Sequence, residues 1–362
     1  MEEISQNVDI DFIKTRAYIA RHSYIENMGN KLAAFEKRML NKNFNVFWAD
    51  NEASLVELVY QLLPDKIYNK VCFDLPHIPE EFNNTKKIKK IPIVEVENGK
   101  QSASVLFTQA DFGVLETGTL VLLNKRSKNC FNLIPNIFIL LDISKLIDKI
   151  SDLEMLLYLK SYSQNQEFLP EDVKIINRPI KRVVKTKIQQ EGEFNMQDVP
   201  VTIFLYDNGV TEILKDNILR TSLYCINCGK CRTVCPIYQY EKSKEFSPIE
   251  LVKANCFARN RITGDLFSRT LLCGNCVPVC PIQIPITDLL IREMELSKKQ
   301  IPSTLAKTFV RRKKLNKMSK PFQRYFFLRK LYGKNKMLLS YFKQQPSTFF
   351  NIKWLQEHPD DE

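Results

Sequence analysis

The sequence contains few histidines, few glycines and no long uncharged apolar run. Only three of its 362 residues are His, so zinc sites of mixed Cys/His type are poorly supplied with ligands. The most apolar stretch, residues 136–147, is interrupted by Asp142 and is much shorter than a membrane-spanning helix. The first residues, MEEISQNVDIDF, are acidic and lack the apolar segment of a secretory signal. These absences predict a cytoplasmic protein.

Ten cysteines are present, and seven of them lie in two short motifs. In a cytoplasmic chain of this size, such grouping indicates metal ligands rather than disulfides. The first motif, CINCGKCRTVCP, covers residues 225–236, and the second, TLLCGNCVPVCP, covers residues 270–281. When the two are aligned, three cysteines match, and Thr270 of the second motif stands where the first has Cys225.

The spacing C-x2-C-x2-C-x3-C-P is that of the ferredoxin iron–sulfur run, whose fourth cysteine ligates the other cluster. This exchange assigns four thiolates to one [4Fe–4S] cluster, namely Cys225, Cys228, Cys231 and Cys280. It assigns three to the second cluster, namely Cys235, Cys273 and Cys276. A structural zinc site is the competing interpretation, but zinc explains neither the repeated Cys-Pro nor the third Cys at x2 spacing. We therefore predict two iron–sulfur clusters.

The second cluster lacks one thiolate, and three completions are open. It is a [3Fe–4S] cluster on three cysteines, or a [4Fe–4S] cluster whose fourth ligand is Cys256. The third completion is a hydroxyl or water ligand, with Thr270 or Ser268 close by in sequence. Cys256 falls on a predicted helix over residues 248–260, where a free cysteine is otherwise an ordinary buried apolar side chain.

Four of the ten glycines fall in two candidate sites. Gly229 and Gly274 occupy the same place in both cysteine motifs, where we expect them to let backbone N–H groups approach the cluster sulfurs. Gly113 and Gly118 flank Glu116 in the stretch ADFGVLETGTLVLL. They place Glu116 on a tight turn at the start of a strand.

The turn around Glu116 is a candidate for ligand binding or acid–base chemistry. The residues that would take part are Glu116, Thr117, Thr119 and Asp111, and Lys125 and Arg126 beyond the strand could pair with a substrate carboxylate. The competing interpretation is a structural turn whose polar side chains bond to backbone groups, followed by a solvated strand end. The sequence does not decide between these two.

The alternation of helical and strand patterns predicts an α/β domain with a largely parallel sheet over residues 1–210. Strands are expected at 44–49, 70–74, 91–96, 118–124, 136–142 and 201–207, and helices at 27–40 and 52–63. Residues 211–300 read as a helical domain around the clusters, with helices at 248–260 and 285–297. Residues 301–362 form a third segment, a helical extension rich in basic and aromatic residues.

The net charge of +12 belongs to residues 298–362, because residues 1–297 are formally neutral. Residues 298–343 contain 15 Lys or Arg and no Asp or Glu. At helical spacing Phe322, Tyr325, Phe326 and Leu328 form an apolar face, which favours docking on the body or on a partner subunit. Peripheral contact with an anionic membrane surface is less favoured, and nucleic acid is the least favoured partner.

Several stretches in order resemble the lactate-utilisation iron–sulfur proteins, the B components of a three-part L-lactate oxidation system. The stretches are 108–124 (similar to the LUD-domain signature), 201–239, 264–290 and 344–357, and the resemblance covers most of the chain. Two departures stand out. The chain is short at its N-terminus, and Asn136 stands where related domains have His.

The resemblance implies an α/β LUD domain, similar in fold to sugar-phosphate isomerases and CoA transferases, joined to an α-helical dicluster ferredoxin module. It implies an electron-transfer subunit in the oxidation of L-lactate to pyruvate, with two partner subunits and an electron acceptor. A nicotinamide-linked reaction is not expected, since no G-x-G-x-x-G fingerprint is present. The alternative is a ligand-binding or acyl-transfer-like LUD enzyme whose clusters are structural or regulatory, because fold likeness does not establish activity.

Overall fold

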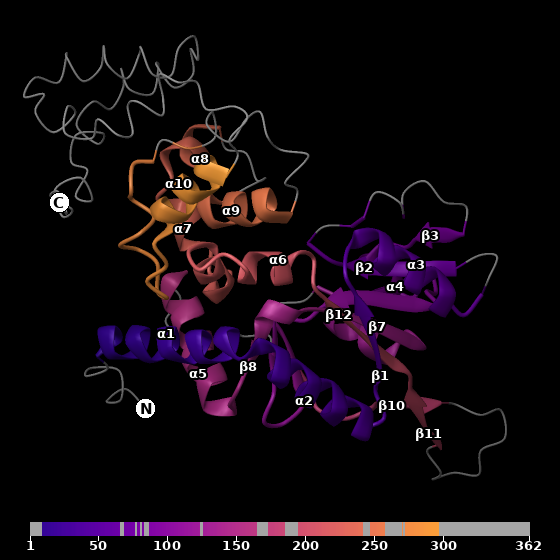
Figure 1. Cartoon of the computed structure of the whole chain (residues 1–362). Coiled ribbons are helices and arrows are strands. Elements are labelled where there is room, and N and C mark those ends of the chain that lie inside the picture. The colour runs from indigo at the N-terminus through magenta and orange to yellow at the C-terminus, as the bar shows by residue number, and fades with distance from the viewer. Residues whose placement is uncertain are drawn as a thin grey trace, which may run out of the picture. The chain divides into compact units, whose positions relative to one another are not determined.

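The computed structural model describes residues 9–65, 69–76, 78–79, 82, 87–123, 126–164, 173–184, 195–241, 247–257, 270 and 272–296 (Figure 1). The chain divides into two compact units, residues 1–211 and 212–362. The predicted basic extension lies outside the described residues. Among the helices that the structure does describe, none is long and apolar enough to cross a membrane.

A six-stranded parallel sheet forms the centre of the first unit, with the strand order β1-β12-β7-β4-β2-β3. The strands are β1 (Asn45–Ala49), β12 (Val201–Tyr206), β7 (Asn136–Asp142), β4 (Val105–Gln109), β2 (Asn69–Asp74) and β3 (Ile88–Lys90). The predictions of a parallel α/β fold and of strands at 44–49, 70–74, 136–142 and 201–207 are confirmed. The predicted strand at 91–96 is wrong, because a short helix, α4 (Ile93–Glu97), lies there with Pro92 as its N-cap residue.

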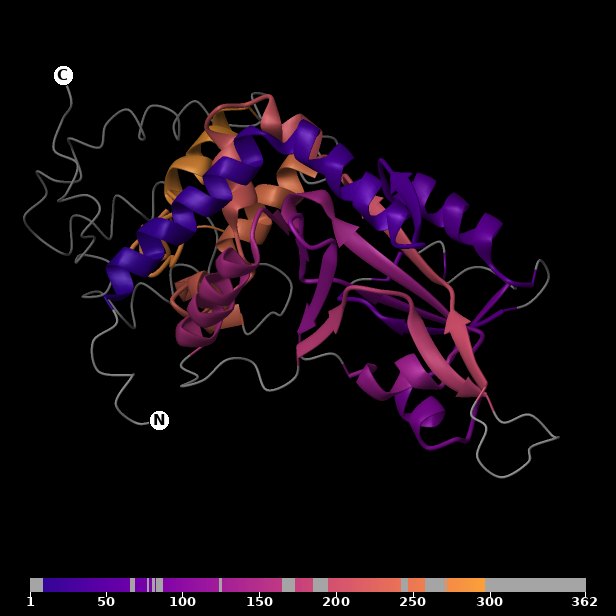
Figure 2. The same ribbon diagram turned by 90° about the horizontal axis from the view of Figure 1, so that it is seen from below.

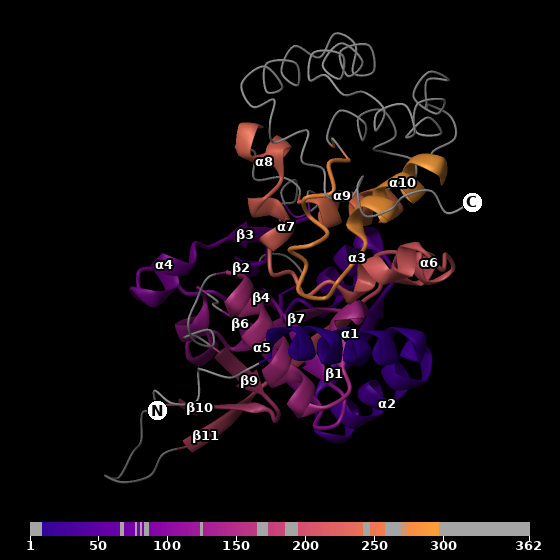
Figure 3. The ribbon, with the colours of Figure 1, turned by 90° about the vertical axis from the view of Figure 1, so that its left-hand side faces the viewer.

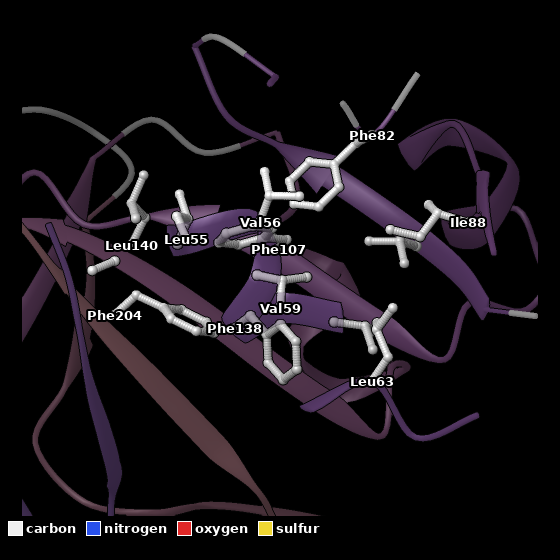
Figure 4. Close-up of a cluster of buried hydrophobic side chains, with 13 residues drawn as sticks. Leu55, Val56, Val59, Leu63, Phe82, Ile88, Phe107, Phe138, Leu140 and Phe204 are labelled. Carbon is white, nitrogen blue, oxygen red and sulfur yellow. The ribbon is translucent and has the colours of Figure 1, made fainter. Parts of the chain in front are cut away.

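Helix α3 (Glu52–Leu62) covers one face of this sheet (Figure 4). The helix begins at a capping box, in which Asn51 and Ser54 each satisfy the backbone N–H of the other. Its apolar stripe packs on aromatic rings of the central strands, with the ring centroids of Phe138 and Phe204 5.4 Å apart. A truncation such as Phe204→Ala would leave a cavity costing about 3–5 kcal/mol.

Helical segments lie on both sides of the strands (Figure 2). Opposite α3, Phe35 of α2 (Met28–Asn41) and Leu141 of β7 meet at Gly113, where an added Cβ would lie 3.4 and 3.1 Å from their side chains. Helix α1 (Ile10–Glu26) packs against α5 (Ile150–Ser163). Both faces of the sheet are therefore buried, which explains why its strands are continuous apolar runs.

Two smaller sheets complete the first unit. A four-stranded sheet has the order β8-β5-β6-β9, built from β8 (Leu146–Ile147), β5 (Phe112–Val114), β6 (Thr119–Leu123) and β9 (Val173–Ile176). The predicted strand at 118–124 is therefore real but belongs to this second sheet. Strands β10 (Ile180–Val184) and β11 (Asn195–Val199) form a separate antiparallel pair. The 3-10 turns η3 (Lys128–Asn132) and η4 (Ile143–Lys145) follow β6 and β7.

Short helices surround the cysteine loops of the second unit. They are α6 (Val210–Leu214, at the boundary), η5 (Leu219–Tyr224), α7 (Lys230–Thr233), α8 (Pro236–Glu241), α9 (Pro248–Phe257) and α10 (Ile286–Leu296). Helices α9 and α10 lie side by side (Figure 3). Arg292 of α10 bonds through its Nε to the Asp216 carboxylate at 3.0 Å, which ties α10 to the segment before η5. Asp216 and α10 thus fix the end of the second cysteine loop.

Candidate iron–sulfur centre

The seven motif cysteines lie on two loops of the second unit, each leading into a helix. On the first loop, Cys225 follows η5 and Cys235 directly precedes α8. The second loop ends at α10. All seven are free thiols, and Cys225, Cys231 and Cys276 are buried while the others are half-buried.

The structure brings Cys280 of the second loop to Cys225 and Cys228 of the first. Burial, together with these two neighbouring thiols, raises the pKa of Cys280 to about 12. Burial and the same two neighbours also raise the pKa of Cys231 to about 12. The four thiols that the ligand exchange assigns to one cluster therefore lie together.

A second group joins Cys235 to Cys273 and Cys276. Burial, with Cys235 nearby, raises the pKa of Cys273 to about 11. Burial also raises the pKa of Cys276, and Cys273, Cys231 and Cys235 contribute to that shift. Since Cys231 belongs to the first group, the two groups are neighbours.

Backbone N–H groups converge on the thiols of the first group. The N–H of Asn227 donates to the Cys225 Sγ and that of Ile284 to the Cys280 Sγ, both at 3.4 Å. The Ile249 N–H and the Ser247 side chain bond to Cys231. Ile249 lies in the first turn of α9, so the positive end of a helix dipole points at this sulfur.

A salt bridge holds the first loop against α9. Arg232 of α7 contacts the Glu250 carboxylate at 2.6 Å. The same carboxylate accepts the Ser247 N–H at 2.7 Å, and the Ser247 hydroxyl accepts the Glu250 N–H at 3.3 Å. This capping box fixes Ser247 at the start of α9. The contact of Ser247 with Cys231 joins residues far apart in the sequence, so no local sequence pattern predicts it.

The donor set fits anionic iron–sulfur clusters. Thiolates are the ligands of such clusters, and backbone N–H donors around the sulfurs stabilise the added negative charge. Among the described residues, no group of three or more His, Cys, Asp or Glu is arranged to hold a single metal ion, and this statement includes the two thiol groups. Gly229 and Gly274 have φ of 75° and 80°, a conformation that favours glycine. Their proposed role of exposing N–H groups to the clusters stays a prediction.

The candidates for the missing ligand are only partly described. Thr270 is half-buried, and its Oγ1 accepts the Leu272 N–H at 3.2 Å. Cys256 lies in the last turn of α9, but the structure does not describe its side chain. Ser268 lies outside the described residues.

In the first unit, Glu116 contacts the start of a helix. Its carboxylate accepts the N–H of Ile150, the first residue of α5, at 3.1 Å. Its own N–H donates to the Asp148 carbonyl at 2.9 Å, and Arg38 donates to the Glu116 carbonyl. The contacts are those of a helix cap, which favours the structural interpretation of this turn.

The other predicted residues of this turn are also engaged. The hydroxyls of Thr117 and Thr119 bond to each other at 2.7 Å. Lys42 donates to the Thr117 carbonyl at 2.5 Å and to the Gly118 carbonyl at 3.3 Å. Gly118 has a φ of 56°, so a residue with a side chain would be strained there.

Asp111 bridges two elements beside that turn. Its carboxylate contacts Lys160 of α5 at 3.2 Å and accepts the Leu123 N–H of β6 at 2.9 Å. Gly113 is required by packing, since an added Cβ would lie 2.4 Å from the Leu146 side chain. Arg126 is exposed, and Lys125 lies outside the described residues.

Asn136 links two strands of the main sheet. Its side-chain amide donates to the Ser104 carbonyl at 2.9 Å, next to β4. The residue that replaces the expected His therefore has a structural partner at the start of β7.

Two family models match parts of the chain. Residues 32–201 match the model of the LUD domain, and residues 221–284 match that of the 4Fe-4S dicluster domain. The resemblance stated from the sequence is thereby confirmed at the level of these two domains. A solved DUF162 family protein from Deinococcus radiodurans aligns with a TM-score of 0.34 and 11% identity, over 49% of this chain and 98% of that one.

Among curated proteins, the chain is similar to several named lactate utilization protein B. The protein from Bacillus cytotoxicus is 27% identical over 54% of this chain and 40% of its own length. The protein from Macrococcus caseolyticus is 27% identical over 52% of this chain and 39% of its own length. Lactate utilization protein B 2 from Bacillus mycoides is 25% identical over 60% of this chain and 44% of its own length. The matched part is thus less than half of each relative.

Proposed function

The chain carries a LUD domain followed by a 4Fe-4S dicluster domain, and we propose that it is the iron–sulfur electron-transfer subunit of a complex that oxidises L-lactate to pyruvate. The observation that carries the proposal is the grouping of seven thiols from two distant motifs into two neighbouring sets. The similarity to proteins named lactate utilization protein B supports the substrate.

Each set would hold one cluster. Cys225, Cys228, Cys231 and Cys280 would hold a [4Fe–4S] cluster, and Cys235, Cys273 and Cys276 a second one. When bound, such clusters accept and donate single electrons. Each cluster would take ligands from both motifs. The two clusters would therefore lie close enough to exchange electrons within the second unit.

The surrounding residues would set how readily electrons are accepted. Reduction adds negative charge, and N–H donors to the sulfurs stabilise that charge. The N–H groups of Asn227, Ile249 and Ile284 serve this purpose in the first group. Burial of Cys225 and Cys231 excludes water from the same region. These buried sulfurs and N–H donors would favour a one-electron centre at this position.

The proposal includes partners, because the relatives named lactate utilization protein B carry the name of one component of a larger system. We propose two partner subunits and a separate electron acceptor. In the LUD domain, the contacts of Glu116 and Asp111 favour structural roles, so we place lactate oxidation at a partner rather than at this turn.

Reduction by lactate tests the proposed function. The anaerobically purified full chain, mixed with its partner subunits, is given L-lactate while the visible absorption and the EPR spectrum of the clusters are recorded. We expect the clusters to become reduced only when lactate and partners are both present. Clusters that stay oxidised with every combination of partners would refute the proposal.

Two variants sharpen this experiment. Cys228→Ala removes a ligand of the first cluster and is expected to abolish electron flow through the chain. Cys72→Ala removes a buried thiol of the first unit, outside both motifs, and is the matched control. It should leave the reduction by lactate intact.

A further inference from the structure

The second cysteine loop follows the same backbone path as the first. In the first loop, the Arg232 N–H donates to the Gly229 carbonyl at 3.0 Å. At the matching place in the second loop, the Val277 N–H donates to the Gly274 carbonyl, also at 3.0 Å. The repeat in the sequence is therefore also a repeat of the fold.

The likeness extends upstream, toward the position of the missing cysteine. Asn227 and Leu272 occupy matching positions and have φ of 55° and 49°. Asparagine adopts this left-handed conformation readily, whereas a leucine does so only where its surroundings impose it. The second loop therefore has the same left-handed turn as the first, although leucine does not favour this conformation.

The first residue of each loop makes the same contact. The Cys225 Sγ accepts the Asn227 N–H at 3.4 Å. The Thr270 Oγ1 accepts the Leu272 N–H at 3.2 Å. In both loops the N–H donor lies two residues after the acceptor. The Thr270 oxygen therefore occupies the position in the second loop that the Cys225 sulfur occupies in the first.

We infer that the Thr270 hydroxyl occupies the fourth ligand position of the second cluster, opposite the thiolates of Cys235, Cys273 and Cys276. The second cluster is then a [4Fe–4S] cluster with one iron on oxygen. This inference rests on the cluster binding proposed above. Because a hydroxyl oxygen is a weaker ligand for iron than a thiolate, that iron is the first to leave the protein.

The expected loss has a defined balance. One electron passes from the cluster to ferricyanide, and the oxygen-ligated iron leaves as Fe²⁺. A [4Fe–4S]²⁺ cluster is thereby converted to a [3Fe–4S]⁺ cluster on the three cysteines, and ferricyanide becomes ferrocyanide. The product has a characteristic EPR signal, so the reaction can be followed without any assay of activity.

The test compares four full-length proteins, reconstituted anaerobically and treated with ferricyanide: wild type, Thr270→Cys, Thr270→Val and Cys256→Ser. Iron per chain and the three-iron EPR signal are measured before and after oxidation. The wild type should lose about one iron per chain and gain the signal. Thr270→Cys, which restores the full motif, should suppress both changes. Thr270→Val should show the signal before oxidation, and Cys256→Ser should behave as wild type.

Three results would overturn the inference. If Cys256→Ser shows the three-iron signal before oxidation and Thr270→Val does not, the fourth ligand is the Cys256 thiolate. If Thr270→Cys and Thr270→Val both match wild type, the Thr270 side chain is not at the cluster. If no variant, wild type included, binds iron and sulfide, cluster binding itself fails and the proposed function falls with it.

Discussion

The Cys280 thiol lies beside the Cys225 thiol, although the two belong to different motifs and different loops. The first cluster therefore depends on both loops. We predict that Cys280→Ser disrupts the first cluster, whereas Cys235→Ser, in the other motif, disrupts the second. EPR spectra of the reduced variants would distinguish them, since each should retain the signal of the opposite cluster. Loss of the same cluster in both variants would contradict the exchange of ligands.

A second prediction concerns Thr287 in the first turn of α10. Its hydroxyl is buried near the Cys276 thiol and has no hydrogen-bond partner among the described residues. We expect it to donate to the Cys276 thiolate when the cluster is bound. Thr287→Val keeps the shape but removes this donor, and the loss of a hydrogen bond worth about 1 kcal/mol lowers a one-electron potential by about 40 mV. A redox titration followed by EPR measures the shift. The first cluster of the same variant is the control, and an equal shift of both clusters would show that the effect is not local.

The cap formed by Glu116 leads to a third prediction. Glu116→Ala removes the carboxylate that accepts the Ile150 N–H at the start of α5. We expect a loss of about 1 kcal/mol in the free energy of unfolding. Urea unfolding followed by circular dichroism measures it, and iron content should not change. Glu116→Gln, which keeps an oxygen acceptor, is the matched variant and should lose less; equal stability of all three proteins would contradict the capping role.

A fourth prediction concerns pH and Asp152 of α5. Burial raises the pKa of this carboxyl, with Asp148 adding to the effect, and the Lys149 backbone opposes it. A raised pKa in the folded state means that stability from Asp152 is present below the usual Asp pKa and is lost as pH rises through the folded value. Asp152→Asn should therefore raise the melting temperature at neutral pH, and the gain should shrink as the solution is acidified.

The control for this pH effect is Glu154→Gln, an exposed acid on the same helix. It should leave the melting temperature nearly unchanged. A gain from Asp152→Asn that is constant with pH would show that the charge of Asp152 is not its cause.

Much of the fold is predictable because its strands are long apolar runs. The strands β1, β2, β7 and β12 are expected from such runs alone, since both faces of the sheet are covered. The sequence does not predict the central strand β4, because its residues 105–109 run directly into the turn that precedes β5. It does not predict the second sheet either, since the partner strands β8 and β9 are only two and four residues long.

The cysteine positions of the candidate site are predictable, but their surroundings are not. Fixed spacing reveals the seven thiols, because ligand geometry constrains the chain between them. The contact of Ser247 with Cys231 depends on how α9 packs, which no short pattern encodes. The same holds for the turn of Leu272, whose left-handed φ is unexpected for leucine.

The most direct test of the central claim, that this chain holds two iron–sulfur clusters, is a measurement of iron, acid-labile sulfide and zinc in the anaerobically purified protein. The account predicts about eight iron and eight sulfide per chain, with no stoichiometric zinc. Zinc at one or two per chain without sulfide would contradict it, and the cysteine motifs would then be structural zinc sites.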